Sequence, residues 1–271
     1  MTIIQTFVFF DLETTGIPAK TAKVTEITLI SVSRSDIEQT DSGKLPAVNK
    51  LSLLCNPKKN IQTTAAKLTG LTNQFLKNQP IFKDNIKCIN AFLDKPKPVC
   101  LVAHNGDRFD FKILQSEYLT ANEYLPNDLM CLDTLNAFRN ILKDPKYNYT
   151  NAVHNSISSL DESDRVSNGE EWQDLSVEEI QEIDELCERL MSTPNKVAKK
   201  TENHTPKTTN TNMESAPKVN YKLCTVYEQL LNKKVKECHR AEADCIMLLE
   251  CAIATKRDFL NYADDKCKSI G

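Results

Sequence analysis

The sequence contains no run of eighteen or more apolar residues, so we expect no membrane-spanning helix. Its amino terminus, Met1-Thr2-Ile3-Ile4-Gln5, lacks the basic region and the long apolar core of a secretory signal peptide. None of the ten cysteines belongs to a Cys-x-x-Cys pair, which argues against a structural zinc site. Without secretion, we expect these cysteines to be reduced thiols.

The amino-acid composition is that of an ordinary globular protein. The 271 residues are enough for one large domain or two small ones, and 40% are hydrophobic and 26% charged. The net charge of −3 is unevenly distributed, because residues 161–190 hold twelve acidic and two basic side chains, which leaves +7 for the rest. A moderately basic body permits a polyanionic partner such as nucleic acid but does not require one.

The pattern of apolar residues predicts a mixed α/β sheet covered by helices. The first three expected strands are joined by links too short for a helical crossover, so they form an antiparallel meander: 4–10, 24–33 and 48–55. A fourth strand at 99–104 is apolar almost throughout, which indicates a central position buried on both faces. Helices and a short strand alternate around it and after it: 65–68, 82–93, 111–119, 130–132, 134–142, 223–231 and 241–256. The passage 35–43 is polar and turn-rich.

Residues 144–220 interrupt this order and separate two parts of one folded domain, 1–143 and 221–271. The interruption is rich in Asn, Ser, Thr, Lys and Pro, so we expect a largely disordered insertion. It contains one acidic amphipathic helix at about 176–191, which opens with a capping box formed by Ser176 and Glu179. That helix either docks on its own domain or binds a partner.

Two carboxylates, Asp11 and Glu13, end the first strand. Side chains alternate along a strand, so these two project to one side while Leu12 packs inward. Such a pair is either solvated at a strand end or held by a divalent cation, since like charges a few ångströms apart repel each other.

A second group follows the fourth strand. Asp110 stands between Phe109 and Phe111, where a carboxylate is costly unless it is paired or bound to a metal. Asp107 is interpreted as the N-cap of the next helix. His104 is either part of the site or a hydrogen-bonded residue at the strand end.

The third group is His239 with Asp244. Residues five apart on one helix do not share a face, so the two come together only if the helix begins near Ala241. His239 then lies on the approach to the helix, and Asp244 lies in its first turns, where the helix dipole tolerates a carboxylate.

These motifs resemble those of the DEDD-type 3′→5′ exonucleases with a histidine base, which have a ribonuclease H-like fold, and among them the animal three-prime repair exonucleases. Four stretches carry the resemblance in the right order: Phe10 to Pro18, Lys67 to Thr72, Ala103 to Phe111 and His239 to Asp244. The resemblance covers residues 4–143 and 221–256.

The resemblance assigns a role to each matching position. It makes four acids the metal ligands: Asp11, Glu13, Asp110 and Asp244. It makes His239 the general base, and an imidazole of ordinary pKa, about 6.5, suits proton transfer near neutral pH. The terminal nucleotide is held by Thr14, Ile17, Leu68 and Phe109, although without the resemblance the last three read as ordinary core residues. Four carboxylates suit two Mg²⁺ ions, with Mn²⁺ as an alternative.

The expected function is a metal-dependent 3′→5′ exodeoxyribonuclease that acts on single-stranded or frayed DNA 3′ ends in DNA repair or DNA degradation. The alternative substrate is RNA. A nucleic-acid-binding module without catalysis is disfavoured, because the four acids and the histidine are all present. The family is typically homodimeric through an edge strand, for which 48–55 is the candidate. The chain ends soon after its last helix, so we expect a soluble protein of nucleus or cytoplasm without a membrane anchor.

Overall fold

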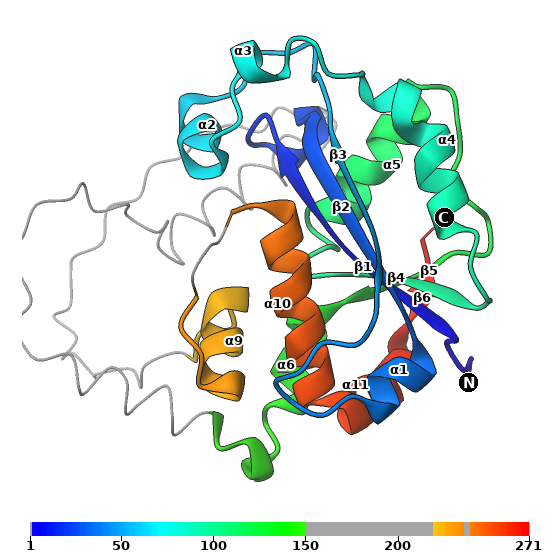
Figure 1. The fold of residues 1–271 in the computed structure, drawn as a ribbon, viewed down its shortest axis with the longest axis vertical. Coiled ribbons are helices and arrows are strands. Elements are labelled where there is room, and N and C mark those ends of the chain that lie inside the picture. The colour runs from blue at the N-terminus through cyan, green and yellow to red at the C-terminus, as the bar shows by residue number, and fades with distance from the viewer. Residues whose placement is uncertain (1, 150–218, 236–238, 271) are drawn as a thin grey trace, which may run out of the picture. The chain divides into compact units, whose positions relative to one another are not determined.

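The computed structural model describes residues 2–149, 219–235 and 239–270 (Figure 1). The predicted acidic helix at 176–191 and most of the predicted insertion lie outside the described residues. A six-stranded sheet has the order β3-β2-β1-β4-β5-β6. Its strands are β1 (Thr6–Thr14), β2 (Val24–Ser33), β3 (Asn49–Leu54), β4 (Val99–Ala103), β5 (Met130–Asp133) and β6 (Lys268–Ser269). Two short 3₁₀ helices are η1 (Ala19–Thr21) and η2 (Pro145–Tyr147). The α-helices are α1 (Arg34–Gln39), α2 (Thr63–Thr69), α3 (Asn73–Leu76), α4 (Phe82–Leu93), α5 (Asp110–Thr120), α6 (Thr134–Ile141), α9 (Leu223–Leu231), α10 (Ala241–Ala254) and α11 (Lys256–Lys266).

The pairing of the strands confirms the predicted mixed sheet. β1 pairs antiparallel with β2, as their short link requires, and β2 pairs antiparallel with β3. β4 lies between β1 and β5 and runs parallel to both. All five residues of β4 are buried, as predicted for a central strand.

The alternation of side chains along β1 divides the core into two clusters. Phe7 and Phe9 pack in the cluster that includes residues of α6, α9, α10 and α11. Val8 and Phe10 pack in the cluster that includes residues of α4 and α5. Figure 1 shows α10 and α11 on one side of the sheet and α4 and α5 on the other. The odd-numbered residues of β1 therefore face α10, and this decides where its terminal carboxylates point.

Two expectations about local structure are wrong. The passage 35–43 is not all turn, because α1 forms there, with the Ser33 hydroxyl accepting a hydrogen bond from the Asp36 backbone at its start. Ile37, which is fully buried, is the apolar residue that anchors this short helix. Because a single apolar residue produces no helical periodicity, the sequence does not predict the helix. The chain also continues beyond α10 into α11 and β6, and β6 pairs antiparallel with β5.

The described residues that flank the predicted insertion pack against each other. Tyr149 is buried, and its ring stacks on that of Tyr221 with 5.3 Å between the ring centroids. Its hydroxyl donates a hydrogen bond to the Asn220 carbonyl. The boundaries 143 and 221 stay a prediction. Among the helices of the described ranges, none combines the length and the apolar character that crossing a membrane requires.

Candidate metal centre

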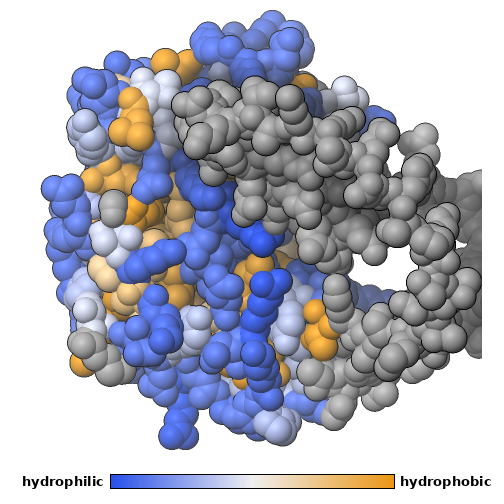
Figure 2. Space-filling model, turned by 180° about the vertical axis from the view of Figure 1, so that it is seen from behind, coloured by the Kyte–Doolittle hydropathy of each residue, from blue (hydrophilic) through white to orange (hydrophobic). Residues whose placement is uncertain are grey.

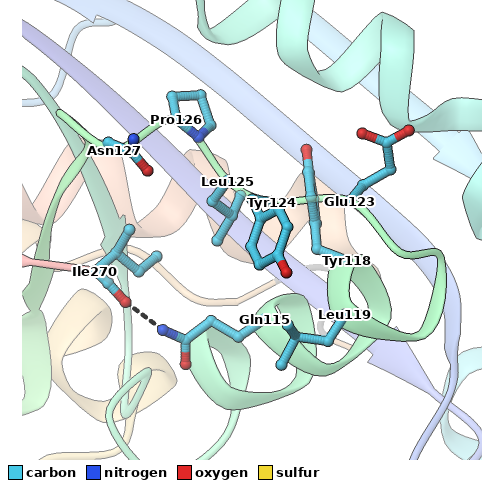
Figure 3. A pocket seen from close by; sticks show the side chains of 9 residues that line it. All are labelled: Gln115, Tyr118, Leu119, Glu123, Tyr124, Leu125, Pro126, Asn127 and Ile270. Atoms are coloured by element: carbon cyan, nitrogen blue, oxygen red, sulfur yellow. Dashed lines mark hydrogen bonds between the residues drawn. The ribbon is translucent and has the colours of Figure 1, made fainter.

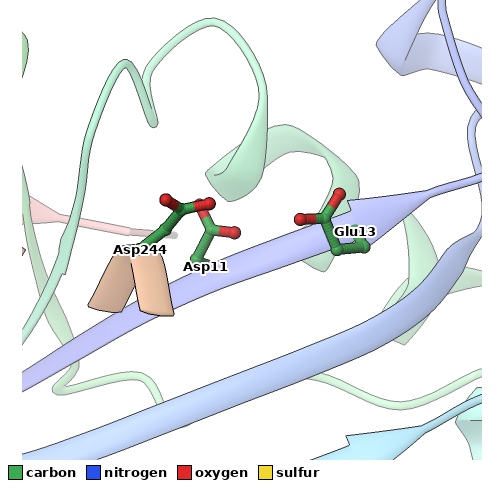
Figure 4. A group of neighbouring side chains, drawn as sticks. All are labelled: Asp11, Glu13 and Asp244. Carbon is green, nitrogen blue, oxygen red and sulfur yellow. The ribbon is translucent and has the colours of Figure 1, made fainter. Parts of the chain in front are cut away.

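The end of β1 places two carboxylates opposite the start of α10. Asp11 and Glu13 continue the Phe7–Phe9 face of the strand, and Leu12 packs in the other cluster. Carboxylate oxygens of Asp11, Glu13 and Asp244 all lie within 4.8 Å of one another. Figure 4 shows Asp244 beside Asp11, with Glu13 further along β1. Residues more than 230 positions apart in the sequence thus converge at one point.

Asp110 joins this group from the turn that follows β4. It is the first residue of α5 and is 7% exposed. Its negative charge raises the pKa of Asp11 and of Glu13, and the backbone of Leu12 hydrogen-bonds to its carboxylate. The structure therefore places Asp110, from α5, beside the cluster of Asp11, Glu13 and Asp244 from β1 and α10.

The prediction that Asp107 caps this helix is wrong, because α5 begins three residues later and Phe109 is its N-cap. The reason is the tight turn before the helix, where Asn105 has a positive φ of 62°. The buried Asp133 carboxylate accepts hydrogen bonds from the backbone N–H groups of Asn105 and Asp107 and holds this turn. The Asp107 side chain instead forms an ion pair with Lys268 at 2.8 Å.

His239 lies outside α10, as its spacing from Asp244 predicted. The helix begins at Ala241, and His239 is exposed with a positive φ of 63°. Its backbone hydrogen-bonds to the Asp244 carboxylate, and its side chain lowers the pKa of that carboxylate. The histidine is therefore held next to one of the acids while its ring stays accessible.

The electrostatics of the group show a shortage of positive charge. Burial, followed by repulsion from neighbouring carboxylates, raises the pKa of Asp11 well above its usual range and that of Glu13 to about 8. Burial likewise raises the pKa of Asp110 to about 7 and that of Asp244 to about 6. Four carboxylates in this arrangement are fully ionised at neutral pH only when a cation compensates them.

Sequence reasoning missed an ion pair at the edge of the centre. Glu26 on β2 stands opposite Glu13 in the strand register and is 4% exposed. Arg240 binds it through two nitrogens at 2.7 and 3.0 Å, and the Ala241 backbone N–H donates to it at 3.3 Å. A glutamate inside the apolar run 24–33 is the signal that points to a buried partner.

The four predicted nucleotide contacts surround the end of β1 in different ways. Thr14 is the last residue of β1, and Phe109 is half-buried at the start of α5. Ile17 and Leu68 are 45% and 44% exposed, which is unusual for core residues. The Gln62 side chain hydrogen-bonds the backbone of Ile17 in both directions, so the segments that carry these residues are joined.

Gly16 makes this junction possible. Its φ is +120°, and a Cβ atom at this position would lie 2.2 Å from the Gln62 side-chain oxygen. A residue with a side chain here would displace the Gln62 side chain and break its hydrogen bonds with the Ile17 backbone.

His104 is hydrogen-bonded through both ring nitrogens, to the Thr134 hydroxyl and to the Tyr221 carbonyl, each at 3.0 Å. Burial lowers its pKa to about 4. A pocket of about 320 Å³ lies elsewhere, at the end of α5 (Figure 3), and contains none of the predicted site residues. It is lined by residues such as Tyr118, Tyr124 and Ile270, and the Gln115 side chain donates to the Ile270 carbonyl.

Comparison with known proteins gives consistent results. The sequence profile of the family described as Exonuclease (RNase_T) matches residues 8–162. Mouse three prime repair exonuclease 2 is 39% identical over 147 residues, which are 51% of this chain and 62% of that protein. Human three-prime repair exonuclease 1 is 39% identical over 150 residues, which are 50% of this chain and 48% of that protein. The chain thus spans 62% of the length of the first relative and 48% of the second.

Among solved structures, the zinc-bound complex of E. coli exonuclease I with single-stranded DNA has a TM-score of 0.55 at 15% identity. The match covers 94% of this chain and 41% of that chain. This similarity supports the predicted ribonuclease H-like fold.

Proposed function

The chain belongs to the exonuclease family, and on this premise we propose that it is a divalent-metal-dependent 3′→5′ exodeoxyribonuclease. Its substrates are single-stranded DNA and frayed DNA 3′ ends. One observation carries the proposal: Asp11, Glu13 and Asp244 converge with Asp110 beside them, and burial together with neighbouring carboxylates raises the pKa of all four. The likeness to three-prime repair exonucleases over half of the chain supports the direction of cleavage and a role in DNA repair.

The donor set fits hard divalent cations. The centre offers carboxylate oxygens and no thiolate among the clustered groups of the described residues, which suits Mg²⁺ or Mn²⁺ better than a softer metal. We propose that Asp11, Glu13, Asp110 and Asp244 hold two such ions. When bound, the ions activate a water molecule and stabilise the leaving 3′ oxygen.

The remaining site residues orient the strand and move a proton. His239, exposed beside Asp244, accepts the proton of the attacking water. The exposed side chains of Ile17 and Leu68, together with the Phe109 ring, offer apolar surface on which a terminal base stacks without sequence preference. Thr14 contacts the same nucleotide from the end of β1.

A digestion experiment tests the proposal. A 5′-labelled DNA oligonucleotide is incubated with the chain in Mg²⁺, in Mn²⁺ and in EDTA, beside an RNA oligonucleotide of the same sequence. We expect a ladder that shortens from the 3′ end, with DNA faster than RNA and with no product in EDTA. Internal cuts, equal rates in EDTA, or degradation of RNA alone would each overturn the proposal.

Two further parts of the proposal concern assembly and location. Within residues 2–149, 219–235 and 239–270, β3 is the outermost strand on one side of the sheet and pairs only with β2, so its other edge is a candidate contact for a second copy of the chain. We propose a homodimer through this edge and a location in the nucleus or cytoplasm. Light scattering during gel filtration measures the dimer. A Pro substitution at Ser52, whose backbone N–H faces away from β2, should convert it to monomer.

A further inference from the structure

The connection between β3 and α4 carries an unusual charge. Residues 55–81, which include α2 and α3, contain four lysines and no acidic residue, although the chain as a whole has a net charge of −3. All four lysines are exposed: Lys58, Lys59, Lys67 and Lys77. Figure 2 shows hydrophilic residues at the top of the molecule, the end where Figure 1 places α2 and α3. This segment therefore presents a local positive potential.

Two asparagines bring three of these lysines together. The Asn56 side chain accepts a hydrogen bond from the Lys58 backbone N–H at 3.0 Å and donates one to the Lys77 carbonyl at 2.8 Å. The Asn73 side chain donates to the Lys59 carbonyl at 2.7 Å. We call Lys58, Lys59 and Lys77 the lysine cluster.

In the described ranges, the lysine cluster is paired with no carboxylate. Within the described part of the chain, Lys58 and Lys77 form no ion pair, and the Lys59 ammonium group donates to the Thr21 carbonyl. Other lysines of the fold form ion pairs with carboxylates, for example Lys23 with Glu117 at 3.0 Å. Among the described residues, the cluster is therefore a set of exposed positive charges that no carboxylate neutralises.

The same segment is fixed to the metal centre. The Gln62 backbone N–H donates to the Thr15 carbonyl at 2.9 Å, and its side chain donates to the Ile17 carbonyl at 2.7 Å. Thr15 is only two residues beyond Glu13. In Figure 1, α2 lies at the same end of the molecule as the end of β1 and the start of α10. The segment that carries the lysine cluster is thus joined to the end of β1 that holds two of the carboxylates.

We propose that the lysine cluster binds backbone phosphates of a single DNA strand on the 5′ side of the nucleotide held at the metal centre. The inference rests on the proposed function and extends it from the terminal nucleotide to the strand behind it. Lysines neutralise phosphates without reading sequence, which suits an enzyme that advances along any strand. Phe75 on α3, 58% exposed, offers a ring on which one base of that strand stacks.

The experiment compares a long substrate with one too short to reach the cluster. The double variant Lys58→Gln/Lys77→Gln and the unmodified chain are assayed in Mg²⁺ on a 20-nucleotide DNA strand and on a dinucleotide. KM and kcat are measured at 50 and 200 mM salt. Two lost phosphate contacts predict that the rise in KM for the long strand over this fourfold salt range is about sevenfold smaller in the variant. We expect kcat to be unchanged, and we expect both constants for the dinucleotide to be unchanged.

A matched control removes the same charge elsewhere. Lys87→Gln/Lys143→Gln replaces two exposed lysines outside the segment, and it should keep the salt dependence of the unmodified chain. A salt dependence in Lys58→Gln/Lys77→Gln equal to that of the control would overturn the inference. An equal loss on the dinucleotide would do so as well.

Binding without chemistry separates this inference from the proposed function. Fluorescence anisotropy of the labelled 20-nucleotide strand in EDTA reports the lysine cluster even if no strand is cleaved. A chain that binds the strand through the cluster but never shortens it contradicts the proposed function alone. A chain that shortens DNA with no contribution from the cluster contradicts the inference alone. Phe75→Leu keeps apolar bulk but removes stacking, and it should weaken binding of the long strand only.

Discussion

Two groups of buried and half-buried carboxylates in this protein differ in their partners. In the first group each acid has a cation from the chain itself: Glu26 with Arg240, Glu117 with Lys23, Glu250 with Lys233 and Asp264 with Arg34. In the second group the acids lie close to one another, and burial, followed by repulsion from neighbouring carboxylates, raises the pKa of every member: Asp11, Glu13, Asp110 and Asp244.

The difference shows that burial alone does not define the candidate site. The fold neutralises carboxylates where they serve to join elements, as Asp264 joins α11 to the segments that carry Ile4 and Arg34. At the end of β1 it collects four acids without supplying equal positive charge. We therefore expect substitutions in the two groups to have opposite effects on activity and on stability.

The largest effect is expected for Asp244→Asn. The change removes one metal ligand at nearly constant volume, so exonuclease activity should fall below detection in the labelled-strand assay. The unfolding midpoint in EDTA should stay equal or rise, because one of four mutually repelling groups becomes neutral. A fall in midpoint would show that Asp244 belongs to the first group.

His239→Ala should leave the carboxylates in place and remove the proposed base. The expected loss in kcat is about 10²- to 10⁴-fold, the range typical of general base catalysis. Stabilisation by Mg²⁺, read from the unfolding midpoint, should persist. A kcat within threefold of the unmodified chain would exclude His239 as the base.

Asp264→Asn should have the opposite effects: it should lower stability and leave activity unchanged. Arg34 contacts this carboxylate through two nitrogens at 2.8 and 2.9 Å, and the change leaves that guanidinium without its buried partner. The expected loss is about 3 kcal/mol in the free energy of unfolding, measured by denaturant titration. Activity per folded molecule and the stabilisation by Mg²⁺ should be unchanged. A loss of either would contradict the assignment of Asp264 to a group separate from the metal centre.

Glu26→Gln tests the member of the first group that adjoins the second. Its pair with Arg240 fixes the residues on either side of the α10 start, so the change should lower kcat about tenfold, as for residues that support a metal ligand. KM should stay the same. Arg240→Lys keeps the charge but not the two-point contact, so its kcat should be intermediate. An unchanged kcat in both variants would show that the Glu26–Arg240 pair does not position the metal centre.

Much of this arrangement is readable from the sequence because it depends on local periodicity. The alternation Phe7 to Glu13 along β1 predicts both the split core and the shared face of its carboxylates. The spacing between His239 and Asp244 predicts where α10 begins. The apolar character of every residue of β4 predicts its central position in the sheet.

The remainder depends on contacts between distant segments. Glu26 and Arg240 are 214 positions apart, and nothing local identifies one as the partner of the other. β6 is two residues long and exists only because β5 offers a free edge. The lysines at 58 and 77 are ordinary in sequence, and they become a cluster only through the side chain of Asn56.

The most direct test of the two-group account is the unfolding midpoint as a function of pH, in EDTA and in Mg²⁺. The raised pKa of Glu13 means that the folded state holds its proton more tightly than the unfolded chain, whose carboxyl titrates near 4.5. This contribution to stability is present below pH 4.5 and is lost as the pH rises through about 8. Asp110 and Asp244, with values of about 7 and 6, act in the same direction.

The account predicts that the midpoint in EDTA falls between pH 5 and pH 8, and that Mg²⁺ restores it by an amount that grows with pH. Asp244→Asn should reduce that gain, and Asp264→Asn should retain it. A midpoint at pH 8 that is the same in EDTA and in Mg²⁺ would contradict the claim that these four carboxylates form a metal centre.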